Sequence, residues 1–377
     1  MVFYRKYRPQ NLAEIDKEEI RRRLSFILAS PKAIPHAFLF TGPKGTGKTS
    51  AARILAKAVN CLKRSTSEVD GTPSKERGDT PASPAGGSEV KGIEPCNHCF
   101  QCLSITNGTN LDVLEIDAAS NRGIDEIREL RDKIKLAPAS AHYKVYIIDE
   151  VHMLTTEAAN ALLKTLEEPP AHAIFVLATT EPQKLPETII SRCLRFNFGR
   201  ATREEIVRAL QRVISGENIK LKESVLELIA DFADGSFRDA QKILEEAVFE
   251  NLTTDEEIRK LLGLTAPPLL QKILRSLFRK DAKEALETVL SAYNEGANIK
   301  NLNEGVLEAL HNLLLDKCGV AAIPDRLSLL EVDKISSLEI RQLINLFSKA
   351  YQELKIASVP TLPLELAIIE WCEGKEG

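Results

Sequence analysis

Over the first 200 positions, short apolar runs alternate with longer amphipathic stretches. The apolar runs predict strands at residues 37–40, 111–116, 144–148, 174–178 and 193–198. The run Val145-Tyr-Ile-Ile148 is continuously apolar, as expected of a parallel strand that helices cover on both faces. The pattern therefore predicts an α/β domain built on a parallel sheet.

Beyond residue 200 the strand pattern disappears, and apolar residues recur with helical spacing. Helices are predicted at 202–214, 222–233, 237–249, 269–278 and 302–317. We expect Gly216, Gly235 and the string Thr265-Ala-Pro-Pro268 to break the helical pattern. Three domains follow: an α/β core at 1–201, a small helical domain at 202–265 and an all-α domain at 266–377.

The segment 62–95 departs from the α/β pattern of its surroundings. Its large apolar residues are Leu62, Val69, Val90 and Ile93, and most of the remainder is Ser, Thr, Pro, Gly or charged. Such a segment cannot bury enough apolar surface to offset the entropy lost on ordering. We therefore expect a flexible insertion at 62–95 within the α/β core.

Composition excludes several classes of protein. A chain of 377 residues with 44% hydrophobic and 28% charged residues suits a folded protein of two or three domains. No run approaches the roughly 18 apolar residues of a membrane span, and the start lacks the apolar core of a signal peptide, so a cytoplasmic location is expected. Lys+Arg minus Asp+Glu is 50 − 54 = −4. Contact with DNA would therefore need a local basic patch or an assembled ring.

The string Gly42-Pro-Lys-Gly-Thr-Gly-Lys-Thr49 matches the phosphate-loop pattern G-x-x-x-x-G-K-[ST]. It lies between the strand predicted at 37–40 and a helix predicted at 50–59, which is the setting that this motif requires. Backbone N–H groups can then surround the phosphates of ATP at the positive end of a helix dipole. We expect Lys48 to reach the terminal phosphates and Thr49 to bind Mg²⁺. The predicted nucleotide-binding residues are Gly42, Pro43, Lys44, Gly45, Thr46, Gly47, Lys48 and Thr49.

Two adjacent carboxylates, Asp149 and Glu150, end the strand predicted at 144–148. Strand ends often carry an acidic residue for solubility or capping. Beside an intact phosphate loop, however, Asp149 can hold magnesium through water and Glu150 can polarise the water that attacks the γ-phosphate. The pair therefore predicts ATP hydrolysis rather than binding alone.

Four of the seven cysteines gather between residues 61 and 102. Cys96-Asn-His-Cys99 and Cys99-Phe-Gln-Cys102 form interlocked C-x₂-C spacings, and Cys61 ends the helix after the phosphate loop. In a reducing compartment this predicts a structural Zn²⁺ held by Cys61, Cys96, Cys99 and Cys102 in an insertion at about 61–102. Free buried thiols and His98 as a replacement ligand are alternatives, although we expect His98 to face solvent. Cys193, Cys318 and Cys372 are expected to pack in the interior.

Longer strings resemble a known family. Asp149-Glu-Val-His-Met-Leu154, Asn160-Ala-Leu-Leu-Lys-Thr-Leu-Glu-Glu-Pro-Pro170, Leu177-Ala-Thr-Thr-Glu-Pro-Gln-Lys-Leu-Pro186 and Ser191-Arg-Cys193 resemble the clamp-loader branch of the AAA+ ATPases. The likeness is closest to the gamma/tau family of bacterial DNA polymerase III subunits. It implies an α/β P-loop AAA+ core, then a small helical lid domain and an all-α collar domain.

The resemblance also implies roles for particular residues. It makes Thr180 a sensor of the γ-phosphate, Arg238 a second sensor from the lid, and Arg192 a finger inserted into the ATP site of a neighbouring subunit. Tyr7, Arg8 and Pro9 would line the adenine pocket, although proline and aromatic residues at a domain edge are at least as often there for packing alone. The family carries four zinc cysteines in this region, but its first two are much closer in sequence than Cys61 and Cys96 are here.

The function implied is an ATPase subunit that loads a sliding clamp onto primed DNA during replication. Its partners would be the other clamp-loader subunits in a ring-like hetero-oligomer, the sliding clamp and the DNA backbone. A non-hydrolysing scaffold subunit is the first alternative, although such a subunit is expected to lose Lys48, Thr49 or Glu150, which are all present. Another AAA+ remodelling ATPase and a nucleotide kinase are the others. Asp149-Glu150 and Ser191-Arg-Cys193 have no role in kinase chemistry.

Overall fold

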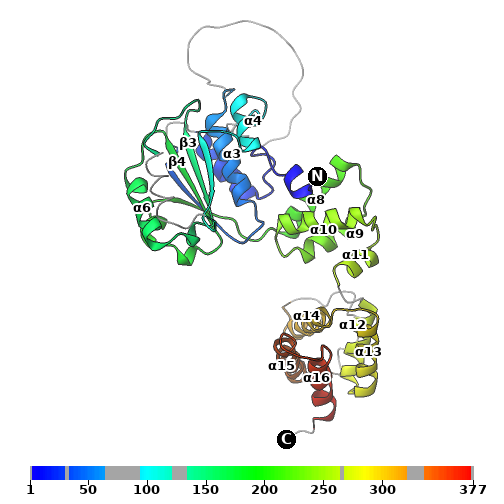
Figure 1. Cartoon of the computed structure of the whole chain (residues 1–377). Helices are drawn as coiled ribbons and strands as arrows, with labels where there is room; N and C mark the ends of the chain where they lie inside the picture. The colour runs from blue at the N-terminus through cyan, green and yellow to red at the C-terminus, as the bar shows by residue number, and fades with distance from the viewer. Residues whose placement is uncertain are drawn as a thin grey trace. The chain divides into compact units, whose positions relative to one another are not determined.

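The computed structural model of the chain describes residues 2–29, 34–63, 94–120, 134–263, 267–320 and 335–374. These residues divide by their packing into two units, Met1–Glu246 and Ala247–Gly377 (Figure 1). The flexible insertion predicted at 62–95 falls almost entirely on 64–93, outside the described residues. The division into three domains stays a prediction.

The first unit contains the strands and the helices around them. Its elements are α1 (Phe3–Lys6), α2 (Glu18–Leu28), β1 (Ala37–Thr41), α3 (Lys48–Asn60), α4 (Phe100–Asn107), β2 (Val113–Asp117), β3 (Lys144–Asp149), η2 (Val151–Met153), α6 (Thr156–Glu167), β4 (Ala173–Thr179), η3 (Pro182–Lys184), α7 (Glu187–Ile190), β5 (Leu194–Asn197), α8 (Arg203–Glu217), α9 (Glu223–Phe232) and most of α10 (Phe237–Phe249). The strands form a parallel sheet in the order β2-β3-β4-β1-β5, which confirms the predicted α/β fold.

Side chains alternate across this sheet because successive residues of a strand point to opposite faces. Phe38 and Phe40 of β1 pack with α2, α3 and α4 on one face, whereas Ala37 and Leu39 pack with α6 and α7 on the other. Helices thus cover both faces (Figure 1). Strands β3 and β4 are buried almost from end to end, as their continuous apolar runs predict.

The strand predicted at 111–116 begins later than expected. Leu111 is 79% exposed, and β2 starts at Val113. The buried carboxylate of Asp112 accepts hydrogen bonds from the backbone N–H groups of Ala139, Ser140 and Ala141. Burial alone would raise the pKa of Asp112, but these hydrogen bonds outweigh it and lower that pKa. The side chain of the residue before the strand therefore anchors a loop, while its backbone oxygen accepts a hydrogen bond from the N–H of Val145 in β3 at 2.8 Å.

Helices α8, α9 and α10 agree with their predicted positions, except that the break predicted at Gly216 was wrong. Helix α8 runs through Gly216 to Glu217 and ends at Asn218, which has a left-handed φ of 55°. Gly216 instead provides space for a neighbour, because a Cβ atom there would lie 2.5 Å from the hydroxyl oxygen of Tyr7. The break predicted at Gly235 is confirmed, with a φ of +79° between α9 and α10.

The second unit is helical throughout its described residues. It contains α11 (Asp255–Leu261), α12 (Pro267–Phe278), α13 (Ala282–Asn294), α14 (Ile299–Lys317), α15 (Ser337–Glu353) and α16 (Leu362–Glu373). Helices α12 to α16 share one hydrophobic core, and the indole N–H of Trp371 donates to the backbone oxygen of Leu277 at 2.8 Å. None of the helices in the described part of the chain combines the length and apolar character that crossing a bilayer requires.

Candidate nucleotide and metal sites

The phosphate loop joins β1 to α3, and its glycines adopt backbone conformations that other residues rarely take. Gly42, Gly45 and Gly47 have φ values of +146°, +77° and +97°. A Cβ atom on Gly42 would lie 2.0 Å from the backbone oxygen of Phe198, and one on Gly45 would lie 2.0 Å from Ser236 Oγ. Gly42 therefore requires glycine for space as well as for conformation, whereas at Gly45, where the close atom belongs to a side chain, the positive φ is the stronger requirement. Gly47 caps the N-terminus of α3, where free N–H groups can bind an anion.

Lys48 and Thr49 begin α3 at the carboxyl edge of the sheet. The Lys48 ammonium is buried, and it donates hydrogen bonds of 2.7 Å to the backbone oxygens of Gly42 and Pro43. Burial lowers the pKa of Lys48, while the carboxylates of Glu150 and Asp149 oppose that shift. Thr49 Oγ1 donates to Asp149 Oδ2 at 2.8 Å. The predicted magnesium ligands Thr49 and Asp149 thus lie together, within reach of the lysine.

Glu150 follows β3 in a left-handed conformation with a φ of 48°. Its Oε2 atom accepts hydrogen bonds from Thr180 N at 3.2 Å and Thr180 Oγ1 at 3.0 Å. A non-glycine residue in this conformation costs about 1–3 kcal/mol, and residues strained in this way cluster at functional sites. The structure therefore joins the predicted catalytic carboxylate directly to the predicted γ-phosphate sensor.

His152 also belongs to this region, although the sequence assigned it no role. The 3₁₀ turn η2 places its Nδ1 atom 2.9 Å from Thr179 Oγ1 and 3.5 Å from Glu150 Oε2. Its Nε2 atom lies 3.5 Å from Glu181 Oε1. The available signal was its position two residues after Glu150, inside the string Asp149-Glu-Val-His-Met-Leu154. His152 links the ends of β3 and β4 beside Glu150, the predicted catalytic carboxylate.

Arg238 lies at the start of α10, next to the phosphate loop. The backbone N–H of Phe237 donates to the oxygen of Gly45 at 3.0 Å, and a Cβ atom on Gly45 would lie 3.4 Å from Arg238 Cβ. The Arg238 guanidinium stands over the ring of Tyr4, 4.7 Å from its centroid. The predicted second sensor is therefore close to the loop, and Tyr4 is a neighbour that the sequence did not identify.

The N-terminal segment reaches the same site. Burial lowers the pKa of Arg8, and the nearby charges of Arg53 and Arg238 lower it further, while Glu115 and Asp149 oppose the shift. Arg8 is therefore close to Asp149 and Arg238 of the predicted nucleotide site. The structure does not test a role for Tyr7, Arg8 and Pro9 in binding adenine, which stays a prediction.

Arg192 is not brought together with the other predicted catalytic residues. It precedes β5, whose first residue, Leu194, pairs with Phe38 near the amino end of β1, whereas the phosphate loop follows the carboxyl end of that strand. The side chain is 34% exposed, and its guanidinium donates to Glu167 Oε1 and to the backbone oxygen of Thr188, both at 2.7 Å. Arg192 therefore lies near the amino ends of the strands, whereas its own phosphate loop lies at their carboxyl ends.

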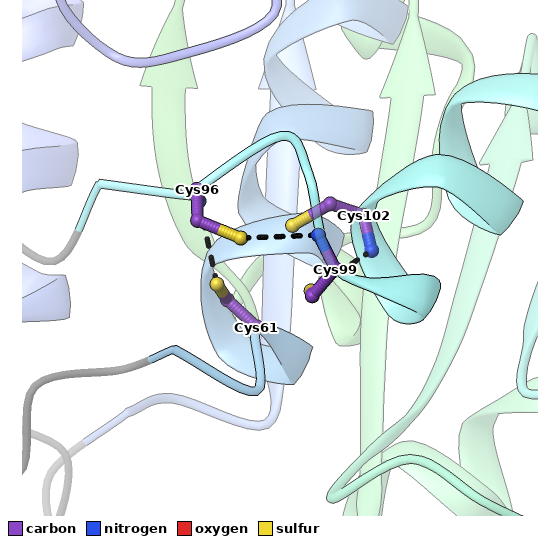
Figure 2. Close-up of side chains that lie close together, drawn as sticks. All are labelled: Cys61, Cys96, Cys99 and Cys102. Carbon is purple, nitrogen blue, oxygen red and sulfur yellow. Dashed lines mark hydrogen bonds between the residues drawn. The ribbon is translucent and has the colours of Figure 1, made fainter.

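The four clustered cysteines come together at the far end of α3 (Figure 2). Cys61 is the C-cap of α3, Cys96 and Cys99 lie on the following loop, and Cys102 is in the first turn of α4. Their sulfur atoms all lie within 4.8 Å of one another. Backbone N–H groups donate to three of the sulfurs: Cys96 to Cys61 at 3.3 Å, Cys99 to Cys96 at 3.3 Å and Cys102 to Cys99 at 3.5 Å.

This arrangement suits a tetrahedral zinc ion. Zn–S bonds of about 2.3 Å place four sulfurs about 3.8 Å apart, so a small contraction would complete the site. Burial raises the pKa of Cys61 and of Cys102, so a cation is needed to hold both as thiolates. Burial also opposes ionisation of Cys96, but hydrogen bonds from the backbone N–H groups of His98 and Cys99 contribute to lowering its pKa to about 6. His98 is exposed, as expected, and is not among the clustered groups.

The remaining cysteines differ in their exposure, although the sequence predicted the same packing for all three. Cys193 is half-buried beside the α6 face of the sheet, and burial raises its pKa to about 11. Cys372 packs against the core of the second unit. Cys318 is exposed at the C-cap of α14, so its predicted place in the interior was wrong. An amphipathic helix that ends at Lys317 leaves the following residue to solvent.

Two family models match the chain. One, described as the delta subunit of DNA polymerase III, matches residues 85–202, and the other, described as domain III of its gamma and tau subunits, matches residues 253–376.

Curated relatives match most of the chain. The DNA polymerase III subunit tau of Bacillus subtilis is 40% identical over 99% of this chain and 63% of its own length. The tau subunit of Escherichia coli is 34% identical over 88% of this chain and 48% of its length. The gamma subunit of Buchnera aphidicola is 34% identical over 84% of this chain and 79% of its length. The chain thus spans about half to two thirds of the two tau subunits and more of the shorter gamma subunit.

Solved structures resemble the chain more weakly. The Holliday junction branch migration motor RuvB of Thermotoga maritima gives a TM-score of 0.46 at 18% identity, over 72% of this chain and 79% of its own. The clamp loader delta protein of Bacillus subtilis gives 0.37 at 13% identity, over 72% and 91%. Family membership rests on the sequence relatives alone.

Proposed function

The chain belongs to the family of DNA polymerase III gamma and tau subunits, and from that premise we propose that it is an ATPase subunit of a clamp loader. It couples ATP binding and hydrolysis to the loading of a sliding clamp onto primed DNA. The observation that carries the proposal is the convergence of Lys48, Thr49, Asp149 and Glu150 at one edge of the sheet, beside an intact glycine loop.

In this proposal each residue at the carboxyl ends of the strands has its own role in ATP binding or hydrolysis. Gly42, Pro43, Lys44, Gly45, Thr46, Gly47, Lys48 and Thr49 surround the phosphates. Lys48 would exchange the loop oxygens that it now binds for phosphate oxygens, and Thr49 and Asp149 would hold Mg²⁺. When bound, Mg²⁺ would supply neutralisation of the charge that develops on the phosphates. In this proposal the Glu150 carboxylate gives up its hydrogen bond with Thr180 Oγ1 and orients the attacking water. The Thr180 side chain then turns to the γ-phosphate.

Two arginines complete the proposed site, one from each of two subunits. Arg238 acts within its own chain, because the start of α10 already touches the phosphate loop. Arg192 acts on a neighbouring subunit, because it lies near the amino ends of the strands and its own phosphate loop lies at their carboxyl ends. A guanidinium suits this role, since it stays charged and grips phosphate oxygens with two parallel N–H groups. An isolated subunit should therefore hydrolyse ATP poorly.

The partners proposed are the other clamp-loader subunits, the sliding clamp and the DNA backbone, in the cytoplasm. In this proposal α8–α10 belong to the lid domain at 202–265. Residues 266–377 form a collar that joins subunits, and the match to domain III of gamma and tau supports that assignment. The proposal includes a structural Zn²⁺ held by Cys61, Cys96, Cys99 and Cys102, which metal analysis should find at about one ion per chain.

The decisive experiment compares Arg192→Ala with the parent chain, alone and in the complex assembled with its partner subunits, clamp and primed DNA. We expect turnover in the complex to fall about 1,000-fold, as for other arginine fingers, with nucleotide affinity changed less than about 3-fold. An equal loss in the isolated subunit would contradict action on a neighbour. A non-hydrolysing scaffold subunit would instead show no turnover that depends on its own Lys48. Turnover without stimulation by clamp and DNA would favour another remodelling ATPase.

A further inference from the structure

Lys57 is a cation buried inside the protein. It lies in α3, one turn before Cys61, and is 1% exposed. Its ammonium donates hydrogen bonds to Gln10 Oε1 at 2.6 Å, Asn97 Oδ1 at 2.8 Å and Thr106 Oγ1 at 3.3 Å. All three acceptors are neutral. Among the residues that the structure describes, no carboxylate lies within ion-pair distance of Lys57.

This arrangement is costly unless a negative charge is nearby. Taking an ammonium out of water costs several kcal/mol, and neutral acceptors replace its hydrogen bonds without neutralising it. Burial accordingly lowers the pKa of Lys57, with Cys102 and Glu14 opposing that shift. The Glu14 carboxylate is already used by the backbone N–H of Gln10 and the side chain of Asn11.

The partners of Lys57 are all close to the cysteine cluster or to the N-terminal segment. Asn97 lies between Cys96 and Cys99 in the loop, with a left-handed φ of 57°. Thr106 is one helical turn after Cys102 and donates to its backbone oxygen at 2.9 Å. Cys61 follows Lys57 by four residues, which places both on one face of α3. The ammonium is therefore held beside elements that supply each of the four thiols.

A zinc ion with four thiolates has a net charge of 2 − 4 = −2. We propose that Lys57 is the counter-charge of the metal-loaded cysteine cluster and positions the loop of Cys96 and Cys99 against α3. This inference rests on the zinc occupancy proposed above. It explains why a cation occupies a buried position between Ala56 and Ala58, in a helix whose buried residues are mostly alanine, isoleucine, leucine and valine.

Lys57 also links the cluster to the N-terminal segment. Gln10, which accepts from Lys57, donates through its side chain to the backbone oxygen of Arg8 at 3.0 Å. Glu94, two residues before Cys96, accepts from the backbone N–H groups of Leu12 at 2.8 Å and Ala13 at 3.1 Å. The loop of the cluster therefore holds the chain that leads to Arg8 and the nucleotide site.

The test measures zinc release from the full chain to a chromophoric chelator. Lys57→Met removes the charge while keeping a long, unbranched side chain in an apolar helix face. Lys63→Met removes an exposed lysine two residues after Cys61 and serves as the control. Removing a group that supports metal ligands typically costs about 10- to 100-fold in metal affinity. If that loss falls on the dissociation rate, we expect release about 10- to 100-fold faster for Lys57→Met and less than about 2-fold faster for Lys63→Met. Equal release from Lys57→Met and the parent would overturn the inference.

A second variant separates the charge from the hydrogen bonds. Lys57→Gln keeps a side-chain donor but no charge, and it also replaces Lys57→Met should that variant fail to fold. A counter-charge requires Lys57→Gln to lose zinc much faster than the parent and to shift the thiolate-to-metal charge-transfer band of the Co²⁺-loaded chain. Parent-like release and spectrum would reduce Lys57 to a hydrogen-bonding role and overturn the inference. A parent chain that binds no zinc overturns this inference together with the zinc proposal, whereas ATP turnover tests the proposed ATPase separately.

Discussion

The two ends of α3 provide two sites of opposite charge. At the N-terminus, Gly47, Lys48 and Thr49 present free N–H groups and an ammonium, which suit an anion. At the C-terminus, Cys61 adds a thiol to the cluster, and the ammonium of Lys57 lies one turn before it. The dipole of a helix favours anions at its first turn and cations at its last. The dipole therefore suits phosphate at the first turn of α3 and the Lys57 ammonium near its last turn. It opposes the net charge of −2 proposed for the zinc-loaded cluster, so that cluster depends on Lys57 and not on the helix for its counter-charge.

The two ends differ in how the chain assembles them. The phosphate end is a continuous string of eight residues, completed by carboxylates from β3. The cysteine end joins Cys61 to a loop that begins 35 residues later, so its geometry depends on packing between α3 and α4. If this contrast is correct, the loss of one site should leave the other intact.

The largest effect is expected at the phosphate end. Lys48→Ala removes the cation that meets the terminal phosphates, so ATP turnover in the assembled complex should fall at least about 100-fold and approach the background. Phosphate release reports the loss, and Lys220→Ala, an exposed lysine outside both sites, is the matched control. Zinc content should stay at the parent value. Unchanged turnover would remove the ATPase proposal, and loss of zinc would show that the two ends are not independent.

Much of the fold could be predicted because its signals are local. Strands β3 and β4 are continuously apolar, and α10 carries a complete helical pattern between Gly235 and its end at Phe249. The errors arose where a distant contact decides the outcome. Gly216 lies inside a helix, and Tyr7, far away in sequence, fills the space that a side chain there would take. Leu111 lies outside β2, next to Asp112, whose carboxylate binds the loop at 139–141.

The sites show the same limit. The phosphate loop, the acidic pair and the cysteines could be selected from the sequence, since each residue type and spacing implies a chemistry. Lys57, Tyr4 and His152 could not, because a lysine in a helix or an aromatic residue near the start has many ordinary roles. Only the fold places Lys57 among Gln10, Asn97 and Thr106.

The cysteine end gives the next effect in size. Cys99→Ser should reduce bound zinc from about one ion per chain to a small fraction, since a hydroxyl is a poor zinc ligand. A metal present at about 1,000 times its Kd adds about 4 kcal/mol to stability, so the free energy of unfolding measured in urea should fall by up to that amount in Cys99→Ser. Cys318→Ser, at an exposed cysteine of the second unit, is the control. The fold-change in the nucleotide affinity of Cys99→Ser should be smaller than the fold-change in ATP turnover expected for Lys48→Ala. A folded Cys99→Ser chain that keeps its zinc would remove Cys99 from the ligand set.

The smallest effect concerns the joint between α3 and the sheet. Asn60, the last residue of α3, is buried; its Oδ1 accepts from the backbone N–H of Tyr143 at 2.8 Å and its Nδ2 donates to the Tyr143 oxygen at 3.0 Å. Asn60→Ala leaves both backbone groups without these partners, which should cost about 2–3 kcal/mol in the free energy of unfolding. Asn107→Ala, at the exposed last residue of α4, should cost less than about 0.5 kcal/mol. Because Asn60 adjoins Cys61 and lies a full helix away from Lys48, zinc release should quicken while nucleotide affinity stays unchanged. The reverse result would be weaker nucleotide binding with normal zinc retention. It would show that loss of the Asn60–Tyr143 hydrogen bonds affects the nucleotide site through α3, and the two ends would then have to be treated as one site.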